Sequence, residues 1–411
     1  MKKTKTIMAI MILLMLTTTT IAVGVAPTDS NDTYTYIIYK NGLNTYAKNG
    51  ATGTIEKTSP ITADVFTYAI THLPTTGGEI FVKAGGYTLT TGLPIVEGLH
   101  IIGEGTAQTT QLFESANTPM FTYNGTKDIY FFVLEHISMY GNPNGTPTCQ
   151  SAIKTNTHMN DGMIFDCCIL RFKGDGINLG TTWGWRIDQS VFEYNGGDGI
   201  HLHGGCDGYI TNSKIISNEG NSIDLDGSCA VIMTGNYLGE SGKNGVLFNN
   251  TTVCTLIGNE FYQDDSHNTG LYSDVYLNSG CNRNIILGNQ IEGASHSKYN
   301  IYLGGTSSTT RNMISLNRLS GALSGSIKRQ VSNTDIIRTN IGYTTENYGT
   351  CTITNGNTIT VNHGLATQPR AITITPIGIF ISYYVDSVTT TQFTLHINKT
   401  TTASFYWTAY A

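Results

Sequence analysis

The sequence predicts an all-β fold: a right-handed, single-stranded parallel β-helix with three strands per coil, capped by an N-terminal helix and followed by a small antiparallel β-sandwich. Three observations predict it. Apolar columns recur every 23 residues, and units that repeat at such intervals stack as a solenoid. Glycine is frequent, at 46 of 411 residues, and only 13% of residues are charged, which favours strands and turns over helices. After residue 342 the repeat stops and strands alternate with turn signals.

Three apolar columns keep the 23-residue step. The first contains Ile177, Ile200, Ile223 and Val246. The other two are Ile164, Ile187, Ile210, Met233 and Leu256, and Ile169, Phe192, Ile215, Leu238 and Phe261. Apolar and polar residues alternate within each unit, which predicts strands with one inward and one outward face. Later steps of 30 and 28 residues predict longer turns rather than lost strands.

A column of small polar residues accompanies the third apolar column, two positions before it. Its members are Cys167, Ser190, Ser213, Asn236, Asn259, Asn289 and Asn317. Such side chains at a tight corner can hydrogen-bond from coil to coil. The column resembles the asparagine ladder of pectate-lyase-like β-helices.

An amphipathic helix is predicted before the repeats, with Thr62 as its N-cap and Pro74 at its end. Its apolar face contains Val65, Phe66, Ala69, Ile70 and Leu73. The strand-rich GEIFVKAGGYTLTTGLPIVEGLHIIGEG follows. From Thr58 to Gly342 the chain thus resembles the pectate-lyase superfamily, in which such a helix plugs the first coil. That superfamily contains lyases, hydrolases, epimerases, viral tailspikes and non-catalytic surface proteins, so the resemblance implies a fold rather than an activity.

Four segments are predicted along the chain: 1–26, a signal peptide or a retained anchor; 27–57, an N-terminal extension; 58–342, the β-helix; and 343–411, the β-sandwich. Lysines followed by an apolar stretch are typical of an export signal. We therefore expect a secreted or extracellular-surface protein without membrane contact beyond that anchor. A net charge of −6 without a basic run argues against nucleic acid as a partner.

The C-terminal segment resembles the end domains of phage and archaeal-virus fibres. The matching residues are Val361, His363, Gly364, Leu365, Thr367, Pro369, Phe405 and Trp407. The resemblance implies assembly, as a homotrimer, or carbohydrate contact rather than chemistry. His363 is expected to be a turn residue.

Ionisable residues gather on the outward side of the first column. The repeat places His201 over Asp224 and His203 over Asp226, roughly 4.8 Å apart. Asp175 and Asp198 precede the column on successive coils. The candidate catalytic residues are therefore Asp175, Asp198, His201, His203, Asp224 and Asp226.

Several functions suit this cluster. The carboxylates can divide into acid and base for glycoside hydrolysis, His–Asp pairs can supply the base of a polysaccharide lyase, and the group can hold a divalent cation. No cofactor is certain, and Ca²⁺ is the candidate. The column of Asp175 and Asp198 corresponds to the catalytic aspartate column of polygalacturonase-type β-helices. However, their adjacent Asp pair, His-Gly and Arg-x-Lys are missing, as is the acidic calcium set of pectate lyases. The alternative is purely structural, because His over Asp is an ordinary cross-strand pair.

Residues beside the cluster leave further alternatives. Trp183 and Trp185 are either a platform for sugar rings or a cover for the coil corner. In the insertion 262–274, we expect Asp264, Asp265 and His267 to be solvated. Cys206 and Cys229, which are 23 residues apart, form either a disulfide or part of a ladder of buried thiols with Cys254 and Cys281, and we expect the thiols.

The leading hypothesis is a secreted polysaccharide-binding protein that recognises acidic glycans along the outer sheet face and cleaves them as a lyase or a hydrolase. The competing hypothesis is a non-catalytic cell-surface or virion fibre, in which the cluster is structural.

Overall fold

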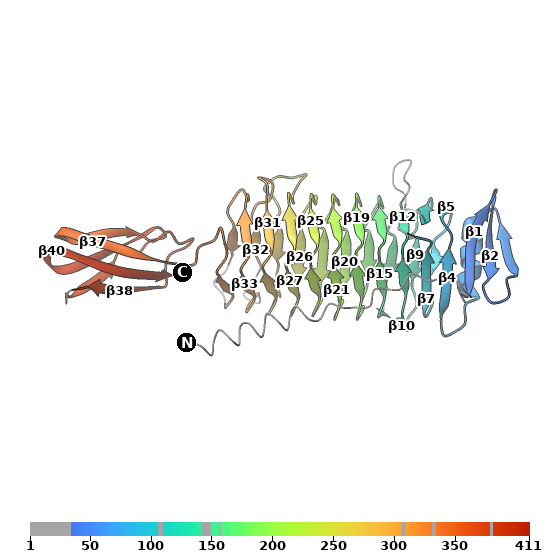
Figure 1. Ribbon diagram of the computed structural model, residues 1–411, viewed down its shortest axis with the longest axis horizontal. Coiled ribbons are helices and arrows are strands. Elements are labelled where there is room, and N and C mark those ends of the chain that lie inside the picture. Colours follow the sequence, from blue (N-terminus) through green and yellow to red (C-terminus); the bar gives the residue numbers. More distant parts are fainter. Residues whose placement is uncertain are drawn as a thin grey trace.

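The computed structural model describes residues 34–411 apart from 106–109, 142–148, 157, 306–308, 331–333 and 379–380. The predicted signal peptide or anchor, 1–26, lies outside the described residues. No helix in the described part of the chain is long and apolar enough to cross a membrane. Figure 1 shows the coils stacked side by side along the long axis, with the C-terminal unit beyond the last coil.

Three parallel sheets form the solenoid. The first sheet contains β4 (Gly78–Val82), β7 (Leu99–Gly103), β11 (Val133–Glu135), β15 (Met163–Phe165), β18 (Arg186–Asp188), β21 (Tyr209–Thr211), β24 (Ile232–Thr234), β27 (Thr255–Ile257), β30 (Ile285–Leu287), β33 (Met313–Ser315) and β36 (Ile336–Arg338). The second sheet contains β5 (Gly85–Leu89), β8 (Thr110–Glu114), β12 (Ser138–Tyr140), β16 (Cys168–Leu170), β19 (Val191–Glu193), β22 (Lys214–Ile216), β25 (Tyr237–Gly239), β28 (Glu260–Tyr262), β31 (Gln290–Glu292) and β34 (Arg318–Ser320).

The third sheet carries the candidate site. It contains β6 (Leu93–Pro94), β9 (Phe121–Tyr123), β13 (Ile153–Thr155), β17 (Ile177–Leu179), β20 (Ile200–His203), β23 (Ile223–Asp226), β26 (Val246–Asn249), β29 (Val275–Leu277), β32 (Ile301–Leu303) and β35 (Ile327–Arg329). A minor pair, β10 (Ile129–Tyr130) and β14 (Met159–Asn160), lies outside the three sheets. Ile177 pairs with Ile200, Ile200 with Ile223 and Ile223 with Val246, and all are buried. The predicted columns and the parallel β-helix are therefore confirmed.

The N-terminal end of the solenoid is covered by strands and by the predicted helix. Three antiparallel strands, β1 (Tyr36–Asn41), β2 (Asn44–Asn49) and β3 (Ile55–Ser59), extend the first sheet through β1 and β4. The helix α2 (Thr62–Thr71) buries Val65, Phe66, Ala69 and Ile70. Its N-cap is Ile61, without a side-chain hydrogen bond. The prediction of Thr62 as N-cap is wrong, because Thr62 lies inside the first turn and its buried hydroxyl meets that of Thr45.

Corner ladders connect the coils. In the predicted column, the backbone N–H of each residue donates to the side chain one coil further on, from Cys167 through Ser190 and Ser213 to the asparagines. The asparagine amides also donate from coil to coil, as Asn289 does to Asn317. This ladder is confirmed. A second ladder at the next corner contains Asn195 and Asn218.

The C-terminal unit has its own core. It consists of β37 (Glu346–Asn362), β38 (Ala371–Ile377), β39 (Tyr383–Asp386) and β40 (Gln392–Tyr410), all antiparallel. β39 pairs with the first part of β40 and β38 with its last part, so the long strands carry both halves of the predicted sandwich. His363 is buried, accepts a hydrogen bond from the Leu365 N–H and donates to the Thr389 carbonyl. It is a turn residue, as predicted.

Candidate functional site

The candidate cluster lies on the outward face of β17, β20 and β23. The register pairs His201 with Asp224 and His203 with Asp226, as the repeat predicts. Asp175 and Asp198 enter the same face from the turns that precede β17 and β20. Since parallel strands keep one register from coil to coil, side chains 23 residues apart become neighbours.

His201 is the centre of the cluster. Its Nδ1 lies 3.5 Å from Oδ2 of Asp175 and 3.5 Å from Oδ2 of Asp198, and its Nε2 lies 4.0 Å from Oδ2 of Asp224. The imidazole is 17% exposed. Burial by itself lowers the pKa of His201, but the three carboxylates outweigh burial and hold the pKa above its ordinary value. The hydrogen bond to Asp175 and the neighbouring carboxyl groups thus favour the protonated form of the imidazole.

The carboxylates around His201 differ in their readiness to lose a proton. Burial works to raise the pKa of Asp175, but hydrogen bonds from His201 and from the Asn178 amide hold it below the ordinary value. Burial raises the pKa of Asp198, and burial together with Asp198 raises the pKa of Asp224 to about 7. Oδ1 of Asp224 is buried and has no hydrogen-bond partner among the described residues. Asp175 is thus an ionised carboxylate, whereas Asp224 holds its proton near neutrality.

His203 and Asp226 form the outer and more exposed part of the cluster. Nδ1 of His203 lies 3.7 Å from Oδ2 of Asp226, and their side chains are 44% and 46% exposed. The His203 ring lies against that of His201, with centroids 3.7 Å apart. Burial and then the positive charge of His201 lower the pKa of His203. Of the two histidines, His203 is therefore the one that gives up its proton more readily.

Two of the candidate aspartates also hold the coils together. Oδ1 of Asp175 accepts the backbone N–H of Asp198 at 2.8 Å, and Oδ1 of Asp198 accepts the backbone N–H of Asn221 at 2.6 Å. Asn221 and Asn244 continue this ladder. Each of these aspartates therefore uses one oxygen for the scaffold and presents the other to His201. The structural and the functional interpretations of the cluster are compatible, because they use different atoms.

One ligand atom each from Asp175, Asp198 and His201 lie within 4.8 Å of one another. This set does not fit the predicted Ca²⁺, which takes six to eight oxygen ligands, because ladder bonds already occupy Oδ1 of both aspartates. Two carboxylates and an imidazole are closer to the ligands of a transition metal.

The two tryptophans have different environments. Trp183 is 58% exposed in the turn after β17, where its ring can offer a face. Trp185 is 3% exposed, packs over Gly162 and donates from its indole N–H to the Met159 carbonyl. Of the two alternatives, Trp185 therefore takes the second and covers the coil corner, whereas Trp183 remains a candidate platform for a sugar ring.

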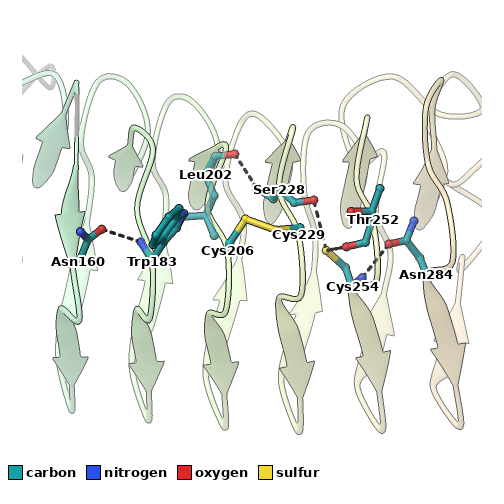
Figure 2. The surroundings of a disulfide bond; sticks show 9 residues. All are labelled: Asn160, Trp183, Leu202, Cys206, Ser228, Cys229, Thr252, Cys254 and Asn284. Atoms are coloured by element: carbon teal, nitrogen blue, oxygen red, sulfur yellow. Dashed lines mark hydrogen bonds between the residues drawn. A yellow bond between two sulfur atoms is a disulfide. The ribbon is translucent and has the colours of Figure 1, made fainter.

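The expected thiol ladder is also wrong. Cys206 and Cys229 form a disulfide between neighbouring coils, with Cα atoms 4.6 Å apart (Figure 2). Beyond Cys229 the same column continues with Thr252 and Asn282. Cys254 and Cys281 are therefore out of line with the column, and both are buried free thiols.

Sequence reasoning missed an aromatic pair on the face of the cluster. Tyr276 of β29 and Tyr302 of β32 follow Asp224 and Leu247 in the same outward column. Their rings stack with centroids 4.9 Å apart, and Gly304 leaves the room that they occupy. At one strand spacing per coil, the pair lies roughly 10–15 Å from Asp224. The sequence signal for this pair was its position in the same outward column as Asp224. Insertions between the coils hide that position, because they break the regular 23-residue spacing.

The insertion between β28 and β29 differs from expectation. Asp264 and Asp265 are fully buried, so their prediction as solvated residues is wrong, whereas His267 is exposed and pairs with Glu219 at 2.9 Å. Ser266 and His267 wall a surface pocket of about 250 Å³ that is also lined by Tyr194, Ser217, Glu219, Glu240 and Gln263. The insertion therefore contributes one side of this pocket, while Asp264 and Asp265 point inward.

The comparisons agree with the fold. The family model of the right-handed β-helix region matches residues 97–238 and 148–272. The chain is a right-handed parallel β-helix protein with a C-terminal antiparallel β unit. Comparison with curated protein sequences finds no match.

Several solved structures are similar. ORF18 of Geobacillus virus E2 has 13% identity and a TM-score of 0.58, covering 88% of this chain and 84% of that one. The DFA-IIIase of Arthrobacter chlorophenolicus A6 in complex with GF2 has 14% identity and a TM-score of 0.51, covering 68% and 94%. The mannuronan C-5 epimerase AlgE6 A-module of Azotobacter vinelandii has 14% identity and a TM-score of 0.47, covering 68% and 94%. At these identities, the similarity establishes the fold alone.

Proposed function

We propose that this protein is secreted, binds a polysaccharide along the outward face of the third sheet, and cleaves it with Asp224 as the proton donor. The observation that carries the proposal is the divergence of two carboxyl groups on either side of His201. Asp224 keeps its proton near neutrality, while Asp175 stays ionised. Groups whose pKa values are pushed apart in this way are suited to divide the roles of acid and base.

The distances support hydrolysis with inversion. Asp175 and Asp224 lie on either side of the His201 ring, with Oδ2 of Asp175 3.5 Å from Nδ1 and Oδ2 of Asp224 4.0 Å from Nε2, which is compatible with the carboxyl separation of about 6.5–9.5 Å in inverting glycosidases. Asp224 would donate its proton to the glycosidic oxygen as the C–O bond breaks. Asp175 would accept a proton from the water that attacks the sugar carbon. His201, between them, would offset the charge of the ionised carboxylates.

The length of the site supports a polymer rather than a small molecule. The cluster and the Tyr276–Tyr302 pair lie on one outward column, and aromatic faces are natural platforms for sugar rings. A chain that follows the column would reach both. A neutral sugar, rather than the acidic glycan expected from the sequence, is favoured beside Asp175, because its ionised carboxylate would repel a uronate carboxylate. The disulfide supports secretion, since such bonds persist in oxidising compartments.

The proposal is tested by incubating the full chain with a fructan, a mannan, a glucan, polygalacturonate and alginate, and by assaying new reducing ends and unsaturated products. Asp224→Asn is expected to lower the rate by about 10²-fold or more, because the amide cannot donate the acid proton.

Wild-type activity is expected to fall as pH rises through about 7, where Asp224 loses its proton.

Glu260→Gln, on the outward face of the second sheet, is the matched control and should leave the rate unchanged. Asp198→Ala is a poor probe, because it also removes the ladder acceptor of Asn221. Unsaturated products would show that the protein cleaves the glycan by elimination rather than by hydrolysis. The absence of both binding and cleavage across the panel would contradict the proposal.

The second candidate is a non-catalytic fibre. It is favoured by the fold similarity to the virus protein ORF18, which extends over 88% of this chain, and by the ladder bonds of Asp175 and Asp198. This function predicts a homotrimer of the full chain. Light scattering coupled to size exclusion tests it, and a monomeric mass at micromolar concentration would count against the fibre.

A further inference from the structure

Asp264 occupies a position that asparagines hold in earlier coils. It lies three residues after the core residue Phe261, as Asn195 and Asn218 lie three residues after Phe192 and Ile215. The atoms coincide too. A Cβ on Gly176 would lie 3.0 Å from Nδ2 of Asn195, and one on Gly199 would lie 2.9 Å from Nδ2 of Asn218.

A Cβ on Gly245, the equivalent glycine of this coil, would lie 2.4 Å from Oδ2 of Asp264. An oxygen of Asp264 therefore stands where the ladder places an amide nitrogen. Ser241 holds this position in the intervening coil, three residues after Leu238, and Asp264 places a carboxyl group where Asn195 and Asn218 have a carboxamide.

The replaced nitrogen is a donor. Nδ2 of Asn195 donates to the carbonyl of Ile169, and Nδ2 of Asn218 donates to the carbonyl of Phe192 at 3.1 Å, in each case 26 residues earlier. The equivalent carbonyl for Asp264 is that of Leu238. A carboxylate oxygen cannot donate, and two acceptors that face each other in a dry interior repel. A protonated carboxyl restores the donor.

The surroundings of Asp264 are acidic. Both oxygens of Asp264 are buried, and neither has a hydrogen bond of normal geometry among the described residues. The hydroxyl and the backbone N–H of Ser241 interact with this carboxyl group and work to lower its pKa. The titratable groups that face it are Asp274 and Asp265, and burial raises the pKa of Asp274 to about 7. Asp274 accepts bonds from Ser297 and Asn300, and Asp265 accepts the backbone N–H of Leu271 and of Tyr272, so both are placed as carboxylate acceptors. Burial, and then Asp274, raise the pKa of Asp264 well above its ordinary value.

We propose that Asp264 is a buried proton-binding site, whose protonated carboxyl completes the second ladder and holds the insertion 263–274 against the coil corner. The insertion is attached around it: Asp265 and Ser266 donate their backbone N–H groups to the Lys243 and Ser241 carbonyls, and Ser297 donates to the Asp264 carbonyl. Loss of the proton would place a charge beside Asp274 in a dry interior. It would loosen the wall formed by Ser266 and His267, and open the surface pocket.

The sign of the pH effect follows from linkage. An unfolded aspartate has a pKa of about 3.9, and the folded value of Asp264 is higher. The folded state therefore binds more protons, and the stability contribution of Asp264 is complete below about pH 4 and is lost as pH rises through the folded pKa. Asp274, Asp224, Asp198 and His201 add pH dependence of the same sign, because their pKa values are also raised in the folded state. The difference between variants, rather than the slope of the wild type, is the diagnostic quantity.

The experiment compares thermal unfolding of the full chain from about pH 4.5 to about pH 8.5. Asp264→Asn supplies the amide that the ladder uses. It is expected to raise the unfolding midpoint by several degrees at the high end and by less at the low end. Asn218→Asp, the reciprocal variant in the same column, is expected to lower the midpoint most at high pH. Hydrogen exchange of residues 263–274, corrected for intrinsic rates, should increase with pH in the wild type but not in Asp264→Asn.

Two results would overturn the proposal. One is a midpoint of Asp264→Asn below that of the wild type at every pH. The other is an Asn218→Asp variant as stable as the wild type at high pH, which remains informative if Asp264→Asn does not fold. Neither result depends on whether the protein cleaves a glycan.

Discussion

Replacing Asn289 with alanine is expected to lower the free energy of unfolding by about 2–5 kcal/mol, although Asn289 contacts no part of the candidate site. Asn289 is an inner member of the corner ladder, between Asn259 and Asn317. Its Oδ1 accepts the backbone N–H and the side-chain amide of Asn259, at 2.9 and 3.0 Å. Its Nδ2 donates to the Leu256 carbonyl and to Oδ1 of Asn317. Alanine leaves two donors and a carbonyl without partners in the interior, and each unsatisfied group costs roughly 1–3 kcal/mol.

Gln290 is the matched control. It follows Asn289 directly, but its side chain is exposed on the outward face of β31. Gln290→Ala is expected to change the stability by no more than about 0.5 kcal/mol. Chemical denaturation of both variants measures the difference. If Asn289→Ala is as stable as Gln290→Ala, water must satisfy the hydrogen-bonding groups that the loss of Asn289 leaves without a partner, and the prediction is contradicted.

Removing the disulfide with Cys206→Ser and Cys229→Ser is expected to lower the free energy of unfolding by about 2–4 kcal/mol. The bond closes a loop over a separation of 23 residues, and its loss frees the unfolded chain to adopt many more conformations. The bond also joins the turns that follow β20 and β23, next to His203 and Asp226. The outer part of the cluster is therefore expected to become more mobile in the double variant.

The measurement is denaturant unfolding with and without a reductant. The reductant should destabilise the wild type and leave the double variant unchanged, because the remaining cysteines are free thiols. A wild type that unfolds at the same denaturant concentration in both conditions would contradict the expectation.

The sequence was sufficient for the cluster around His201, because one periodicity defines both the core and the outward face. If Ile200 packs on Ile223, then His201 must pair with Asp224. The different roles of the aspartates were not predictable in this way. They depend on burial and on ladder bonds such as that from Asn221 to Asp198, which involve backbone groups of other coils.

Trp185 and Asp264 are two buried residues whose burial the local sequence does not reveal. Trp185 belongs to an irregular turn, and nothing in GTTWGW distinguishes a ring over the core from a ring in solvent. Asp264 belongs to an insertion, and insertions are usually solvated. Its spacing of three residues from Phe261 equals that of Asn218 from Ile215, so this signal was present. It becomes meaningful only when the second ladder is known.

A 23-residue period leaves a parallel stack a single way to bury its apolar columns, so the solenoid, its register and the gathering of His201, His203, Asp224 and Asp226 on one face follow from the order of residues alone. The protonation preferences of these groups, the pairing of the cysteines and the inward direction of some polar side chains follow from the folded structure. These properties depend on distances of a few ångströms between coils and on the exclusion of water, and neither is written in the order of residues along one strand.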